Sequence, residues 1–183
     1  MSSVRMSGTV LILSFLLCMG GVVLFARRQS QFISAFVWER GLIMAGFVAA
    51  SVGVVVLARA LLKARARPWA ELGATAFLAG AISILVAEAS LLLEGFDISL
   101  EVGPVIVALL FVGEAAIGIA LLNSGAVARW VAWGLIVWNV LLLLGFLIVS
   151  PREWYYPGLH FPPLLWIGIP LVGANTALAT RAT

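Results

Sequence analysis

Charged residues are scarce in this sequence. Only 10% of its 183 residues are charged and 63% are hydrophobic, with a mean hydropathy of +1.17. A soluble domain carries about 25% charged and about 45–50% apolar residues. So few polar side chains cannot cover a globule in water. The composition therefore excludes an ordinary soluble enzyme, a disordered protein and a nucleic-acid-binding domain, and it predicts an integral membrane protein.

Cysteine and histidine are nearly absent. Cys18 is the only cysteine, so neither a disulfide nor a cysteine metal cluster can form within one chain. His160 is the only histidine, which excludes a haem held between two histidines and a zinc site with several histidines. No glycine-rich phosphate-binding motif is present in the sequence. We therefore expect no bound metal and no cofactor.

Long apolar runs dominate what remains. A helix needs about 20 mostly apolar residues to cross a bilayer. The first run ends at Arg27 and Arg28 without a small-residue cleavage site, so we interpret it as a true span and not a signal peptide. The chain is predicted to form one all-α transmembrane domain, residues 1–183, a polytopic bundle of six helices at about 8–26, 41–62, 70–93, 103–122, 130–149 and 161–179.

The charges predict the orientation. The side that holds the N-terminus carries seven basic residues and one acid: Arg5, Arg59, Lys63, Arg65, Arg67, Arg129 and Arg181, with Glu71. The opposite side carries four basic residues and five acids: Arg27, Arg28, Arg40 and Arg152, with Glu39, Glu94, Asp97, Glu101 and Glu153. By the positive-inside rule both termini are cytoplasmic. We expect a multi-pass protein of the inner (cytoplasmic) cell membrane.

Two acids and one asparagine inside the apolar runs are candidate functional residues. Glu88 lies six residues before Glu94, close enough to the exported end to reach water. Glu114 lies nine residues before Asn123, and Asn139 lies ten residues after Arg129. Both are therefore about 14–15 Å from the cytoplasmic end of consecutive antiparallel helices. We predict that Glu114 and Asn139 lie level and can form a hydrogen bond.

Two interpretations of this pair remain open. The first is an interhelical hydrogen bond that fixes packing, worth about 0.6 kcal/mol on average in membranes. The second is a carboxylate that carries a proton or binds a cation on a transport path.

Small residues also recur at a spacing of four, and they favour close helix packing, within the bundle or against a partner: Ala45, Ala49 and Gly53, then Ala76 and Gly80.

The segment of residues 150–161 is aromatic and is predicted to face the exported side. Trp154 and Tyr155 are typical of the headgroup level, where an aromatic ring is partly buried and its polar edge stays wet. This segment is an interfacial anchor, or it covers a lipid or quinone site in which His160 and Arg152 take part. No serine or cysteine nearby stands in a hydrolase motif.

The second half of the chain resembles small multi-pass bacterial membrane proteins of families of unknown function. The resemblance covers about residues 100–150. It rests on the apolar helix with Gly113-Glu114, the turn Asn123-Ser124-Gly125 and the entry Arg129-Trp130 into the next helix. Those families often have proline before the arginine, where this chain has Ala128. The resemblance implies a bacterial helical bundle and no particular activity.

Three functions fit these features. A non-catalytic accessory or structural subunit of a larger membrane complex is favoured by the short loops and by the lack of a complete catalytic set. A small transporter or channel would use the buried carboxylate. A membrane enzyme that binds lipid or quinone is third, since an enzyme needs reactive groups that converge at one site. We expect membrane lipids and other membrane subunits, or further copies of the chain, as partners.

Overall fold

The structure is a computed structural model that describes residues 2–29, 36–62, 65–94, 99–149 and 160–173. The described residues form helices and short turns, with no strand among them. The helices are α1 (Ser3–Gln29), α2 (Phe36–Ala60), α3 (Arg67–Glu94), α4 (Ser99–Ser124), α5 (Arg129–Val149) and α6 (Phe161–Gly173).

Apart from Leu61 and Leu62, each predicted apolar segment is helical over its described residues, so the all-α prediction is confirmed for these residues. Four helices are long and apolar enough to cross a membrane: α1, α2, α3 and α4. Within the described residues, the apolar part of α5 (Arg129–Gly145) and the whole of α6 are shorter. Length and composition therefore support a membrane protein.

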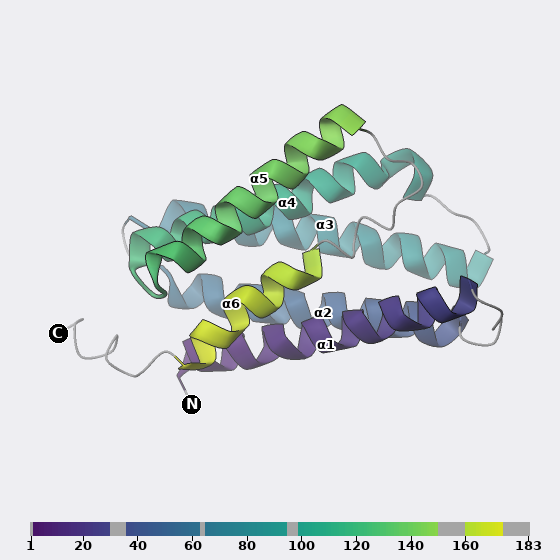
Figure 1. The fold of residues 1–183 in the computed structure, drawn as a ribbon, viewed down its shortest axis with the longest axis horizontal. Helices are drawn as coiled ribbons and strands as arrows, with labels where there is room; N and C mark the ends of the chain where they lie inside the picture. Colours follow the sequence, from purple (N-terminus) through teal and green to yellow (C-terminus); the bar gives the residue numbers. More distant parts are fainter. Residues whose placement is uncertain (1, 30–35, 63–64, 95–98, 150–159, 174–183) are drawn as a thin grey trace.

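The first five helices run up and down the bundle in alternation (Figure 1). We call the end that contains Ser3, Ala60, Arg67, Ser124 and Arg129 the basic end, since it carries the arginine-rich turns. The other end, where α1 ends and α2 begins, is called the opposite end. Packing contacts join α1 to α2, α2 to α3, α3 to α4, and α4 to α5, while α6 packs mainly on α1.

Small residues and serines bring the helices close together. Ser14 Oγ donates to the Gly46 carbonyl of α2 at 2.7 Å, and Ser7 Oγ donates to the Gly53 carbonyl at 3.0 Å. A Cβ on Gly80 of α3 would lie 2.9 Å from Leu110 Cγ of α4. Gly46, Gly53 and Gly80 therefore serve packing inside the bundle, where close backbone approach replaces the hydrophobic drive that lipid removes, whereas Ala45 is exposed.

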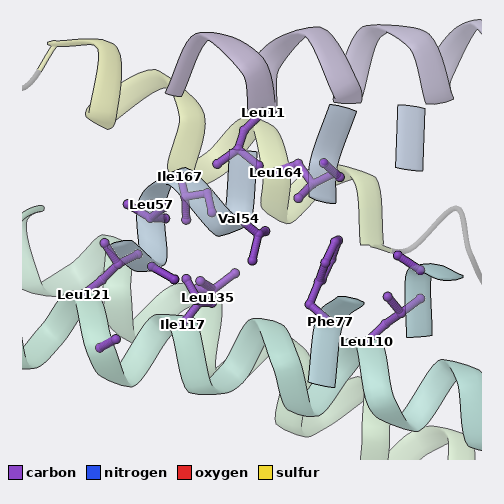
Figure 2. Close-up of a cluster of buried hydrophobic side chains, with 14 of the residues drawn as sticks. Leu11, Val54, Leu57, Phe77, Leu110, Ile117, Leu121, Leu135, Leu164 and Ile167 are labelled. Carbon is purple, nitrogen blue, oxygen red and sulfur yellow. The ribbon is translucent and has the colours of Figure 1, made fainter. Parts of the chain in front are cut away.

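One cluster of buried apolar side chains connects all six helices. Figure 2 shows ten of its members pointing into the centre of the bundle: Leu11, Val54, Leu57, Phe77, Leu110, Ile117, Leu121, Leu135, Leu164 and Ile167. Leu11 belongs to α1 and Leu135 to α5, so the first helix and the last long helix share this core. The core fixes the helices that surround the buried polar side chains described below.

The start of α6 lies halfway along the bundle and not at its end (Figure 1). The ring of Phe161 packs edge-on against Phe47, with 5.8 Å between the centroids, and Phe47 is near the middle of α2. From there α6 runs toward the basic end. A Cβ on Gly8 of α1 would lie 2.7 Å from the Gly168 carbonyl, and Trp166 Nε1 donates to the Val131 carbonyl of α5 at 3.1 Å.

Candidate functional site: a buried carboxylate, imidazole and amide

Glu114 and Asn139 lie on neighbouring helices because the turn between α4 and α5 is short. α4 ends at Ser124, and Gly125 follows with a φ of 65°, a left-handed conformation that favours glycine. The Gly125 amide donates to the Leu121 carbonyl at 3.1 Å. This glycine cap reverses the chain, so that α5 returns beside α4 in antiparallel orientation.

The two polar side chains are almost completely buried, Glu114 at 3% exposure and Asn139 at 0%. Asn139 Nδ2 donates to the Leu135 carbonyl one turn earlier at 2.9 Å, and its side chain also interacts with the Glu114 carboxyl. The helical rise places Glu114 and Asn139 at the same level, and the structure brings them together.

His160 completes this group from a third element. It directly precedes α6 and is fully buried, with Nδ1 at 3.5 Å from Glu114 Oε1. Its ring packs against Phe111, with 4.2 Å between the centroids and 32° between the planes. Phe111 lies three residues before Glu114 on α4, so both side chains extend from one face of that helix.

These polar atoms have few hydrogen-bond partners. Within the described part of the chain, no hydrogen bond reaches either oxygen of Glu114, either ring nitrogen of His160, or Asn139 Oδ1. An unsatisfied polar group costs about 1–3 kcal/mol when it is buried in a protein, and ionisable side chains inside a membrane are typical of functional sites. The cluster therefore has polar atoms available for a proton or a small polar ligand.

The first turn of α6 affects the electrostatics of this site. The N-terminal end of a helix carries a partial positive charge, which favours a nearby anion. Pro162 and Pro163 supply no backbone N–H in this turn, so the helix contributes its dipole with few free donors. The dipole partly offsets the free-energy cost of burying a negative charge on the Glu114 carboxyl.

Glu88 belongs to a second buried group near the opposite end of the bundle. Arg40 Nη1 of α2 donates to both of its carboxylate oxygens, at 2.9 and 3.0 Å. Arg40 Nε also lies 3.2 Å from Glu39 Oε1. The side chains of Arg40, Glu88 and Glu39 are 11%, 9% and 0% exposed. Glu88 is thus held in an ion pair and does not simply extend to water.

The predicted lipid or quinone site at the exported surface can be followed only at His160. Arg152, Trp154 and Tyr155 lie outside the described residues. His160 does not lie at an end of the bundle. It lies halfway along the bundle, beside Glu114.

Sequence analysis missed two pairings, Glu114 with His160 and Arg40 with Glu88. The pairing of Arg40 with Glu88 could have been predicted by counting residues along the two helices. Both residues lie within six residues of the helix terminus that is at the opposite end of the bundle. No local signal gives the depth at which His160 enters the bundle. As for metals, no group of three or more histidine, cysteine, aspartate or glutamate side chains is arranged for one among the described residues.

Comparison with known proteins adds no further information about this site. No family model, curated protein or solved structure matches the chain.

Proposed function

We propose that this protein is a small multi-pass membrane transporter in which Glu114 carries a proton through the interior of the helix bundle. The observation that carries the proposal is a carboxyl group and an imidazole from separate elements, both buried, 3.5 Å apart and without another hydrogen-bond partner in the described chain. Purely structural polar groups in a membrane interior are normally satisfied, because an unpaired one is costly.

The point at which α6 begins supports the same proposal. Transporter sites are often formed near the bilayer midplane, where a helix begins or is interrupted and its dipole points at the bound group. Here α6 begins beside Glu114, halfway along α2 and α4.

The proposal includes the finer membrane topology. We propose six membrane segments in the inner (cytoplasmic) membrane of a bacterial cell, with both termini in the cytoplasm and the basic end on that side. The described basic turns support this orientation, since Arg65, Arg67 and Arg129 all lie at the basic end.

The test is proton flux in liposomes that contain the purified protein and a pH-sensitive dye. A proton gradient should collapse faster with the wild type than with Glu114→Gln, which we expect to lower the flux about a hundredfold, as for loss of a proton-transfer group. Glu71→Gln is the matched control, because Glu71 is half exposed and paired on the surface with Arg67. Equal flux for wild type and Glu114→Gln would reject the proposal.

Stability measurements must accompany this test. We expect Glu114→Gln to keep its thermal midpoint in detergent, because an amide has nearly the same shape as a neutral carboxyl group and can also bond to His160. A large drop in the midpoint would mean that the carboxylate is ionised and paired. The lost flux would then reflect damage to the fold and not loss of the proton carrier.

An accessory subunit of a larger membrane complex is the second candidate. It is favoured by an apolar stripe on the outer face of α5, formed by Trp133, Val137, Leu141 and Leu144, which are 48–61% exposed in the isolated chain. Lipid or a partner helix can cover this stripe. Purification in mild detergent at native expression distinguishes the two, since a subunit should bring stoichiometric partners with it and a transporter should purify alone or as copies of itself.

A further inference from the structure

The Glu114–His160 contact joins two groups that can each hold a proton. Glu114 Oε1 and His160 Nδ1 are 3.5 Å apart. Proton-transfer contacts are often this long in a resting structure and shorten when the reaction occurs. Neither atom has another hydrogen bond among the described residues, and the one further polar side chain that interacts with the Glu114 carboxyl there is the neutral amide of Asn139.

We infer that Glu114 and His160 hold one exchangeable proton between Oε1 and Nδ1, so that the imidazole takes up the proton that Glu114 carries. This inference deepens the proposed function and rests on the same site. It assigns to His160 the role of the group that takes the proton from Glu114 and returns it.

The step is a proton transfer in which all bonds balance. The O–H bond of Glu114 breaks and an Nδ1–H bond forms, which gives a carboxylate beside an imidazolium. The reverse transfer breaks the Nδ1–H bond and restores the O–H bond of Glu114, so the single proton moves between the two atoms.

The surroundings keep this pair separate from other charges. Asn139 of α5 faces Glu114, and Phe111 of α4 covers the His160 ring. On α3 the nearest residues are Gly73 and Phe77, which pack on Gly113.

The other titratable groups on these helices do not join the pair. On α1, Cys18 is buried against Gly46 of α2. On α3, Glu88 lies 11 residues beyond Phe77, which is about 16 Å along the helix. The proton is therefore shared by Glu114 and His160 without a third charged partner at that depth among the described residues.

The single histidine makes a direct test possible. Histidine labelled with nitrogen-15 gives one Nδ1 and one Nε2 resonance for the full chain in lipid nanodiscs, and these report the tautomer and the bonding of each nitrogen. We expect Glu114→Gln to shift the Nδ1 resonance more than the Nε2 resonance, and Glu71→Gln to shift neither. An Nδ1 resonance that is unchanged in Glu114→Gln would overturn the inference.

A second variant keeps the test valid if Glu114→Gln does not fold. Glu114→Asp keeps the carboxyl group and withdraws it by one methylene, so the Nδ1 resonance should move in the same direction by a smaller amount. No movement in the folded Glu114→Asp protein would count against the shared proton.

Failure of the inference and failure of the proposed function give different results. If Glu114→Gln shifts Nδ1 but the wild type moves no protons, the shared proton stands and transport is rejected. If Glu114→Gln abolishes flux while the Nδ1 resonance stays in place, transport stands and the role of His160 is rejected. If both are correct, His160→Gln also lowers the flux, by about a hundredfold.

Discussion

Arg40 is the cation that brings two buried carboxylates together. It lies four residues into α2, and its guanidinium contacts Glu88 of α3 and its own neighbour Glu39. Nη1 contacts both oxygens of Glu88 and Nε lies beside Glu39, so separate nitrogens of one guanidinium reach the two carboxylates. The guanidinium carbon of Arg40 lies 5.3 Å from the centroid of the Phe36 ring, and this contact further orients the side chain. A single residue thus connects α2 to α3 near the opposite end.

Arg40→Gln should strongly destabilise the protein. The variant removes the guanidinium that both carboxylates contact, and loss of one partner from a buried ion pair costs about 3 kcal/mol or more. Arg67→Gln is the control, because the Arg67–Glu71 pair is 64% and 53% exposed and such pairs contribute at most about 1 kcal/mol. Unfolding free energies in mixed detergent micelles would measure both. Equal losses of unfolding free energy in the two variants would show that the Arg40 contacts contribute little to stability.

At the scale of helices, the position of Glu114 depends on how closely α3 approaches α4. Gly113 lies against the backbone of Phe77, and Gly73 lies against the Gly113 carbonyl. This close approach sets the rotation of α4 and turns the next residue, Glu114, into the bundle. The packing of glycine on glycine is therefore a condition for the site, although neither residue has chemistry of its own.

Gly113→Ala should weaken the contact between α3 and α4. The added Cβ would lie 2.6 Å from the Phe77 nitrogen and 2.9 Å from its Cα, and backbone atoms cannot move aside as a flexible side chain can. We expect a loss of about 1–3 kcal/mol, as for overpacked cores. Gly103→Ala on the same helix has nothing within 4 Å of the new Cβ and should be neutral or slightly stabilising. Thermal unfolding of the two variants checks this, and matching midpoints would contradict it.

At the scale of the whole molecule, the bundle separates two polar groups by a continuous apolar core. The Arg40–Glu88 group lies near the opposite end, and the Glu114–His160 group lies halfway along the bundle, where α6 begins. The arginine-rich turns mark the basic end. Charge asymmetry of this kind orients a helical bundle in a membrane, because basic loops stay in the cytoplasm.

Cysteine labelling would test the orientation of the bundle. In a Cys18→Ser background, Asp97→Cys should react with a membrane-impermeant maleimide added outside intact cells. Arg65→Cys, at the basic end, should react only after the membrane is opened. Cys18 itself is fully buried, so its removal should not affect access to the other sites. The reverse labelling pattern would show that the basic end faces outward.

Some features of this protein follow from the sequence alone. The membrane class, the positions of the helical segments and the common level of Glu114 and Asn139 are determined locally. They depend only on apolar length and on the fixed rise per residue of a helix. The glycine that reverses the chain after α4 is also visible in the sequence, since only glycine adopts that conformation freely.

Only the tertiary structure decided which side chains meet. His160 joins Glu114 because α6 begins halfway along α2 and α4, and Arg40 joins Glu88 because α2 packs against α3. Apolar helices of similar length can pack in many orders and depths, and hydropathy does not distinguish among these arrangements. The choice depends on contacts between residues far apart in the chain, such as Gly8 with Gly168, so helix periodicity could not predict the site.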